Sequence, residues 1–519
     1  MGTNKNLLLI VLLAFALRII PLGFPPFTQE EARVAFRGYS LAISGKDELG
    51  RLLPLLFNSL EDYRLPLVSY LTGLGVFLFG KSDLGVRLPF ILMGTALVLL
   101  IYYIAKSLSA KPFFWLASGL VVALSPPLIF LSKTPNESIV LTFIFALLFY
   151  LLINNKRLFT IPVMILAIFL SKFTWFLLVP FIFFTGQKGK LLTASLVFVL
   201  LALAFFLQVP QSKRSLSENN FSLFSDVTII NGINKLRGQG IESNWSPLLG
   251  EILINKSYFF VTGFFHFLSN LAPSILFGQF DKNGNLGFVG MGAFPKIAIL
   301  PALLGMLFLI REKRSKFLLY SLIITLPSAL IYPQFSPQIV ILAIPFIAFV
   351  IAFGFLQMKK SLSTLIFILM ALELIVNLSF LSPLSPQIKS TTYIRPGWIK
   401  TVVEDVFKLS NTNRVLISDD IVEDITPFIG WYTPFNPSEA FLDIPYPYKF
   451  RQTKLGKITV VGVSDSFKTC GTEENTQLFS SKRDLQRLKS ADIVDIEKTY
   501  LDSKGEDATY LIKGRVCIK

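Results

Sequence analysis

The chain has 519 residues, of which 53% are hydrophobic and 16% are charged, and its formal net charge at pH 7 is +16. A soluble domain carries about 25% charged residues, so this composition excludes an ordinary soluble protein. The positive charge does not predict nucleic-acid binding, because the basic residues cluster in short loops between apolar segments, such as NNKR at 154–157 and REKRSK at 311–316. Short basic loops are typical of the cytoplasmic side of a membrane protein.

The apolar segments predict a multispan α-helical membrane protein with about eleven transmembrane helices, since ~20 apolar residues cross a hydrocarbon core. The predicted spans lie near residues 7–20, 84–106, 112–131, 137–153, 157–171, 172–186, 190–208, 294–311, 316–333, 335–356 and 361–381. The first span lacks a small-residue cleavage site, so we expect it to remain as a signal anchor. With the basic loops inside, the N-terminus is cytoplasmic and the C-terminal region lies outside the plasma (cytoplasmic) membrane.

Two further apolar stretches, 65–80 and 258–278, would reverse this charge pattern if they crossed the membrane. We therefore predict that both are interfacial or re-entrant helices on the outer side, where aromatic residues suit the headgroup region. Two large outer loops, about 21–83 and 209–293, complete a predicted membrane domain over residues 1–383.

The tail, residues 384–519, has a different composition. RVLISDD, KITVVGVSD and TYLIKG are typical of β-strands, and SSKRDLQRLKSADI is typical of a short helix. We predict a soluble, extracytoplasmic α/β domain. Its two cysteines, Cys470 and Cys517, lack metal-ligand spacing, and both a disulfide and two separate thiols remain open.

The first outer loop contains the most unusual polar stretch, QEEARVAFRGYSLAISGKDELGRLLP. We predict a helix that begins near Gln29. Helical spacing places Glu30, Arg33 and Arg37 on adjacent turns of one face, whereas Glu31 points elsewhere. A carboxylate here could accept a proton from a hydroxyl group, and the arginines could hold a phosphate as forked donors. A solvated amphipathic helix with internal ion pairs is the alternative interpretation.

Two other outer segments bring charge to the same membrane face. SLEDYRLPL places Asp62, Tyr63 and Arg64 at the start of the predicted interfacial helix. LSKTPNES places Lys133 and Glu137 between two spans. Ionisable residues are costly at membrane depth and generally line a polar cavity, so these segments predict a polar site at the outer face.

These motifs, in this order, resemble the membrane glycosyltransferases of the GT-C class. The first span is followed by an acidic residue and then Glu-Ala (EEA at 30–32). GYSLAISGKDELGRLLP, DYRLPL and LFGKSDLGVRLPFILMGT follow in that order. Within this class, the sequence resembles the protein O-mannosyltransferases and the aminoarabinose transferases of lipid A, with their bacterial relatives. The resemblance covers about residues 1–380, and the tail gives no family signal.

The resemblance implies that a sugar moves from a polyprenyl-phosphate carrier to a hydroxyl acceptor on the outer face, the acceptor being a protein, a glycolipid or a cell-wall polymer. Glu30 takes the place of the family's catalytic aspartate, the general base of an inverting displacement. Arg64 takes the place of a basic residue that holds the carrier phosphate. The expected phosphate ligands are Arg33, Arg37, Arg64 and Lys133, and the expected supporting residues are Glu31, Asp62, Tyr63 and Glu137.

The sequence departs from the family at three positions. Glu30 replaces an aspartate, so its carboxylate reaches one methylene further. Gln338 and Ile341 stand where bacterial relatives often place a histidine and an arginine. The departures keep open a non-catalytic copy of the fold. A polytopic transporter or flippase for a lipid-linked or small substrate also remains an alternative, although it would show internal repeats and broken polar spans.

The predicted partners are the donor, the acceptor and the lipid bilayer, without nucleic acid. No metal ligands are predicted, because the chain has a single histidine, His266, and no ligand motif. Some relatives bind a divalent metal ion, so a metal cofactor stays open as an implication of the resemblance alone.

Overall fold

The structure is a computed structural model, and its described residues group into two compact units. The helical unit comprises Met1–Ile20, Phe90–Ser132 and Asn136–Asn377, and the loop–tail unit comprises Pro21–Pro89, Lys133–Pro135 and Leu378–Lys519. The residues that the structure describes are 2–20, 26–59, 62–170, 173–184, 189–208, 227–243, 246, 257–281, 288, 290–312, 337–379, 395–411, 414–418, 420–422, 424–434, 437, 453–455, 457–461, 467–469, 476–489, 495–502, 504–513 and 516–518.

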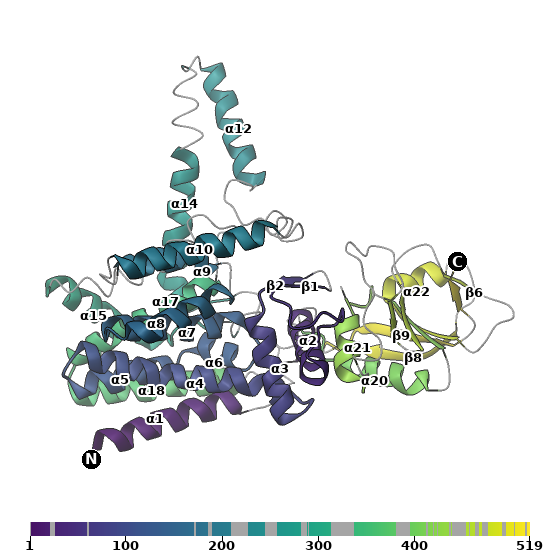
Figure 1. The fold of residues 1–519 in the computed structure, drawn as a ribbon, viewed down its shortest axis with the longest axis horizontal. Helices are drawn as coiled ribbons and strands as arrows, with labels where there is room; N and C mark the ends of the chain where they lie inside the picture. The colour runs from purple at the N-terminus through teal and green to yellow at the C-terminus, as the bar shows by residue number, and fades with distance from the viewer. Residues whose placement is uncertain are drawn as a thin grey trace. The chain divides into compact units, whose positions relative to one another are not determined.

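The helical unit consists mainly of apolar helices (Figure 1), and their positions in the sequence match most of the predicted spans. They are α1 (Gly2–Ile19), α4 (Asp83–Leu108, whose first turns belong to the loop–tail unit), α5 (Pro112–Ala123), α6 (Pro126–Ser132), α7 (Glu137–Ile153), α8 (Arg157–Ile168), α9 (Phe173–Phe184), α10 (Lys190–Gln208), α12 (Val227–Glu242), α14 (Ser257–Asn270), η3 (Ser274–Gly278), η4 (Lys296–Ala298), α15 (Ile299–Arg311), α17 (Pro337–Leu356) and α18 (Lys360–Ser379). The predicted span 316–333 lies outside the described residues.

Three helices in the described part of the chain are long and apolar enough to cross a membrane. They are Asp83–Leu108, Ser257–Gly278 and Lys360–Asn377. A fourth candidate is the pair α5 and α6, which is bent by 60° at its break. The apolar helices support a multispan membrane protein, but the predicted total of about eleven spans is not confirmed.

The two stretches that we predicted to be interfacial have different lengths in the structure. The stretch 258–278 lies within a helix of 22 residues, which is long enough to cross, so the structure does not support its exclusion as a span. The stretch 65–80 forms α3 (Leu67–Phe79), whose 13 residues are too few to cross alone. The interfacial position of α3 stays a prediction.

Glycines let helices α15 and α17 of the helical unit pack closely. Gly305 faces the backbone of α17 at Val350, and Gly354 faces the backbone of α15 at Pro301, so an added Cβ at either glycine would overlap its neighbour. Small residues commonly permit such close approach between helices in membranes. Aromatic rings also pack between helices, as for Phe114 of α5 and Phe353 of α17, whose centroids are 4.3 Å apart.

The loop–tail unit begins with α2 (Gln29–Ser44), a hairpin of β1 (Phe57–Ser59) and β2 (Asp62–Arg64), and α3. The predicted helix near Gln29 is therefore confirmed. Gly38 of α2 lies so close to Thr72 of α3 that its added Cβ would be 2.7 Å from the Thr72 methyl group. This close approach holds α2 and α3 against each other.

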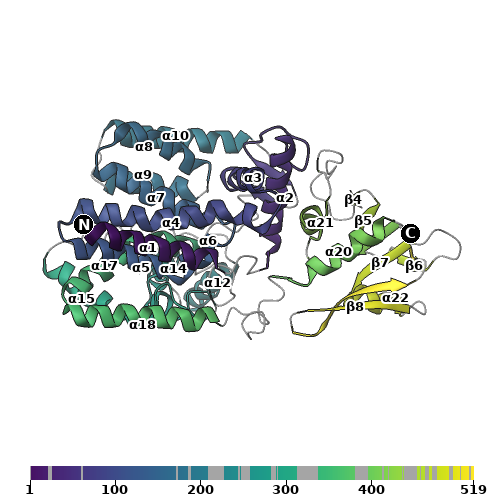
Figure 2. The same ribbon diagram turned by 90° about the horizontal axis from the view of Figure 1, so that it is seen from below.

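The tail forms a mixed sheet with α22 on one face and α20 on the other (Figures 1 and 2), as predicted for an α/β domain. Its strand order is β4-β5-β3-β7-β9-β8, and β3 is parallel to both β5 and β7 while the outer pairs are antiparallel. The bounds are α20 (Ile399–Ser410), β3 (Arg414–Ser418), α21 (Thr426–Tyr432), β4 (Thr453–Leu455), β5 (Ile458–Val461), β6 (Phe467–Thr469), β7 (Thr476–Ser481), α22 (Lys482–Lys489), β8 (Asp495–Leu501), β9 (Asp507–Lys513) and β10 (Val516–Ile518). Strands β6 and β10 form a separate antiparallel pair.

One hydrophobic core runs through the whole loop–tail unit. Val415 and Ile417, which lie on one face of β3, are buried in this core together with the apolar face of α20. Phe36 of α2 is buried in the same cluster. The predicted division at residue 383 stays a prediction about independent folding. In the structure, the first outer loop groups with the tail.

Candidate active site

The start of α2 is fixed by a capping box in which Thr28 and Glu31 satisfy each other. The Glu31 backbone N–H donates to the Thr28 hydroxyl at 3.1 Å, and the Thr28 N–H donates to Glu31 Oε2 at 3.2 Å. A threonine followed three residues later by glutamate is the sequence signature of this motif. The first helical turn, on which Glu30 lies, therefore has a defined position.

Glu30 is the exposed carboxylate of this turn. Its side chain is 70% exposed, and its Oε2 lies 2.8 Å from Nη2 of Arg64, whose side chain is 24% exposed. Arg64 ends β2, where it pairs with Phe57 across the hairpin. The structure thus brings together the predicted base and a predicted phosphate ligand, which come from different segments of the first outer loop.

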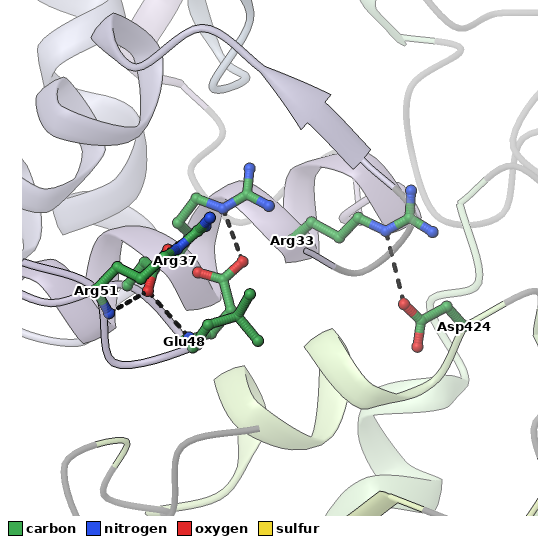
Figure 3. A network of polar contacts seen from close by, with 7 residues as sticks. Arg33, Arg37, Glu48, Arg51 and Asp424 are labelled. Carbon is green, nitrogen blue, oxygen red and sulfur yellow. Dashed lines mark hydrogen bonds and ion pairs between the residues drawn. The ribbon is translucent and has the colours of Figure 1, made fainter. Parts of the chain in front are cut away.

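Arg33 and Arg37 follow Glu30 on α2, but both are largely buried. Figure 3 shows Arg33 beside Asp424 and Arg37 beside Glu48. Arg33 Nε lies 3.7 Å from Oδ2 of Asp424. Arg37 is fully buried, and its Nε donates to Oε1 of Glu48, also fully buried, at 2.9 Å. The guanidinium of Arg37 also lies 4.7 Å from the ring centroid of Phe57. This environment favours a structural role for Arg37 over the predicted contact with the donor.

The loop after α2 holds Glu48 in place. Gly45 ends the helix with φ of 68°, a left-handed conformation that glycine adopts readily. The buried Asp47 then accepts from the backbone N–H of Leu49 at 3.1 Å and of Arg51 at 2.8 Å. The Arg51 side chain also donates from Nε to the Asp47 carboxylate, at 2.8 Å. The turn around Asp47 therefore directs Glu48 back toward Arg37.

Glu31, on the first turn of α2, pairs with Arg395 of the tail. Nη1 and Nη2 of Arg395 donate to the two carboxylate oxygens of Glu31, each at 3.0 Å. Both side chains are buried. Forked pairs of this kind are among the strongest polar contacts in proteins.

Lys81, between α3 and α4, joins the loop to helix α21. Its ammonium group donates to the carbonyl oxygens of Gly430 at 3.0 Å and Thr433 at 2.5 Å, and it lies 3.8 Å from the ring centroid of Tyr39. Burial lowers the pKa of Lys81 to about 8. The carbonyl oxygens and the aromatic face stabilise the charged form at neutral pH.

The remaining predicted site residues come from the hairpin and from the start of α7 and the residues before it. Asp62 and Tyr63 lie on β2, and their side chains fall outside the described residues. Lys133 is buried within the loop–tail unit, whereas the half-buried Glu137 is the first residue of α7 in the helical unit. Their roles in donor binding and support stay predictions.

The described residues contain no group of three His, Cys, Asp or Glu side chains that could hold a metal ion. The side chains of His266, Cys470 and Cys517 fall outside that part of the chain.

The family comparison matches part of the chain. A model of the dolichyl-phosphate-mannose-protein mannosyltransferase family matches residues 64–212, which is less than half of the chain. No curated protein sequence matches the chain.

The structural comparison finds similarity over nearly the whole chain. The crystal structure of ArnT from Cupriavidus metallidurans bound to undecaprenyl phosphate matches with a TM-score of 0.54 and 11% identity, over 99% of this chain and 98% of that chain. ArnT is a GT-C glycosyltransferase. This chain has a GT-C fold. The archaeal oligosaccharyltransferase AglB from Archaeoglobus fulgidus, in complex with an inhibitory peptide and a dolichol-phosphate, matches at 11% identity over 83% of this chain and 63% of that chain. Its TM-score is 0.45.

Within this GT-C fold, sequence reasoning found the helix of Glu30 and missed the partners that hold it. Glu48, Lys81, Arg395 and Asp424 were not among the predicted site residues. Arg395 is 364 residues from Glu31, so no local pattern could connect them. The one available signal was charge, because Arg395 follows the last span in a segment with few other charged residues.

Proposed function

We propose that this chain is a membrane glycosyltransferase that moves a hexosyl or pentosyl group from a polyprenyl-phosphate carrier to a hydroxyl acceptor on the outer face of the membrane. The observation that carries the proposal is the ion pair of the exposed Glu30 with Arg64, on the loop that follows the first apolar helix. Undecaprenyl phosphate bound to ArnT, which has the same fold, supports a lipid-phosphate donor.

The proposed reaction is a single inverting displacement. The Glu30 carboxylate accepts the proton of the acceptor hydroxyl, and the hydroxyl oxygen forms a bond to the anomeric carbon of the sugar. The bond between that carbon and the phosphate oxygen breaks, and the lipid phosphate leaves with the electron pair. Glu30 is suited to this role because its side chain is exposed and its helical turn is fixed.

Arg64 is the proposed ligand of the leaving phosphate. A guanidinium group has five N–H donors, so Arg64 can hold a phosphate oxygen while it keeps a bond to Glu30. Its positive charge would stabilise the negative charge that develops on the phosphate as the sugar leaves. Arg33, one turn further along α2 and largely buried beside Asp424, is the proposed second cation.

The test is sugar transfer by the purified full-length chain. A radiolabelled polyprenyl-phosphate sugar and a panel of hydroxyl acceptors are incubated with the protein in detergent. The acceptor class for the panel comes from mass spectrometry of cell-envelope glycans with and without the protein. Label in the acceptor supports the proposal. Solute accumulation in proteoliposomes without any transfer would support the transporter alternative instead.

A further inference from the structure

The tail reaches the catalytic helix through Arg395. Besides its two bonds to Glu31, the Arg395 side chain donates from Nη1 to the carbonyl oxygen of Pro26 at 2.7 Å. One guanidinium group therefore binds both the Pro26 carbonyl, just before α2, and the Glu31 carboxylate on the first turn of α2. Gly397 packs on the same turn, since its added Cβ would be 3.1 Å from the Pro26 ring.

These contacts bear directly on Glu30. Glu31 uses the same Oε2 to accept from the Thr28 backbone and from Arg395, so the capping box and the tail share one carboxylate. Glu30 is the neighbouring residue, and the direction of its side chain follows from the backbone of this turn. Because Glu30 is itself exposed, packing against its side chain contributes little to its position.

Further contacts follow along the same helix. Asp424 of the tail pairs with Arg33, and Gly430 lies against the ring of Phe36 so closely that an added Cβ would come within 2.4 Å of it. Lys81 then binds the carbonyl oxygens of Gly430 and Thr433 at the end of α21. The tail thus holds α2 at successive positions of one helix, through two ion pairs and a shared hydrophobic core.

We propose that Arg395 is a positioning residue for Glu30, and that the tail completes the active site. This inference rests on the proposed role of Glu30 as the base. Arg395 does not contact the reacting atoms. It acts through Glu31 and the Pro26 carbonyl, which fix the turn that carries the base.

The kinetic consequence follows from this geometry. A misplaced base slows the chemical step, and a shift of about 1 Å can cost about 100-fold in rate. The donor's proposed cation Arg64 lies on β2, whereas Arg395 binds Pro26 and Glu31 at the start of α2. Loss of Arg395 should therefore lower kcat about 10- to 100-fold and change the KM for the donor by less than about 2-fold.

The experiment uses the full chain in detergent with four variants: Arg395→Met, Arg395→Lys, Glu31→Gln, and the double variant Arg395→Met with Glu31→Gln. The matched control is Arg483→Met, because Arg483 is a 65% exposed tail arginine whose pair with Asp420 is 3.9 Å long. Assays run well below the melting temperature of every variant. Arg395→Lys keeps the charge without the fork, so it should retain more turnover than Arg395→Met. The double variant should be no slower than Arg395→Met alone, because both changes remove the same contact.

A second measurement does not depend on activity. Amide hydrogen exchange over residues 29–44 should become faster in Arg395→Met and stay unchanged in Arg483→Met, since Arg395 binds the start of α2 whereas Arg483 pairs with Asp420. Faster exchange with a selective loss of kcat supports the proposal.

Unchanged exchange and unchanged kcat in Arg395→Met would overturn the proposal, and so would multiplicative effects of Arg395→Met and Glu31→Gln. The failure of the proposed function gives a different result. In that case Glu30→Gln keeps full turnover, or the wild-type chain transfers no sugar, while exchange over α2 still responds to Arg395. Loss of turnover in Glu30→Gln but not in Arg395→Met would leave the function intact and refute the positioning role alone.

Discussion

The buried pair of Arg37 and Glu48 gives the sharpest test of how α2 is built. Both side chains have an exposure of 0%, and their Nε–Oε1 distance is 2.9 Å. At an effective dielectric constant of about 20, two unit charges at this distance attract each other by roughly 6 kcal/mol. Much of that attraction offsets the loss of water around the two ions, but removal of one partner leaves the other charge buried and costs about 3–5 kcal/mol.

We therefore expect Arg37→Met to lower the melting temperature of the loop–tail unit by roughly 6–20 °C, at about 2–4 °C per kcal/mol. The double variant Arg37→Met with Glu48→Leu should be more stable than Arg37→Met, since it leaves no unpaired carboxylate. The assay is thermal unfolding of the full chain in detergent, together with titration of a polyprenyl phosphate. Arg483→Met is the control, and as an exposed pair it should cost less than about 1 kcal/mol.

The two roles proposed for Arg37 differ in this assay. If Arg37 is structural, the double variant binds the polyprenyl phosphate with nearly wild-type affinity. If Arg37 is a donor ligand, as the sequence predicted, Arg37→Met loses affinity without losing stability. The second result would refute the assignment drawn from its burial and its pair with Glu48.

Three other changes have defined expected outcomes. Arg64→Ala should weaken binding of a polyprenyl phosphate by about 10-fold or more in titration, because the phosphate loses a charge-assisted bond; unchanged affinity would remove Arg64 from the site. Burial lowers the pKa of Lys81 from 10.5 to about 8. Between these pH values the unfolded chain binds more protons at Lys81 than the folded chain does. The free energy of unfolding should therefore rise with pH from about 8 to about 10.5. The free energy of unfolding is measured by denaturation at about pH 8 and about pH 10, and Lys81→Met should not show the rise between them. An equal rise in the wild type and in Lys81→Met would contradict the assignment. Residues 390–519 expressed alone should fold, because the six-stranded sheet lies wholly within them, but the side of the core that packs on Phe36 should be exposed. The fragment should therefore bind a hydrophobic dye. A fragment that binds no dye would show that the first outer loop is dispensable.

The local structure of α2 could be predicted because its signals are local. Thr28 and Glu31 form a capping box at the spacing that the motif requires, and Gly45 follows the last turn. Helical spacing also put Glu30, Arg33 and Arg37 on adjacent turns. Spacing could not tell that Arg37 is fully buried, because its burial depends on Glu48 and the turn around Asp47.

The contacts with the tail could not be predicted from local patterns. Arg395 and Asp424 meet α2 only after the chain has passed through the whole helical unit, and their segments contain no motif that names a partner. The predicted number of spans stays unconfirmed for a related reason. Several apolar segments form helices of 12 or 13 residues, such as α8 and α15, and hydropathy alone does not show how short or broken helices lie in a membrane.

The most direct test of the central claim is the turnover of Glu30→Gln, with Glu30→Asp beside it. The substitution to glutamine keeps the size of the side chain and removes its ability to accept a proton at neutral pH. Transfer from a radiolabelled polyprenyl-phosphate sugar should fall by about 10²–10⁴ in Glu30→Gln, while thermal stability stays near that of the wild type. Glu30→Asp should keep part of the turnover, because the carboxylate remains at a shorter reach. Wild-type turnover in Glu30→Gln would show that Glu30 is not the base, and α2 would then be an amphipathic helix that packs the first outer loop against the tail.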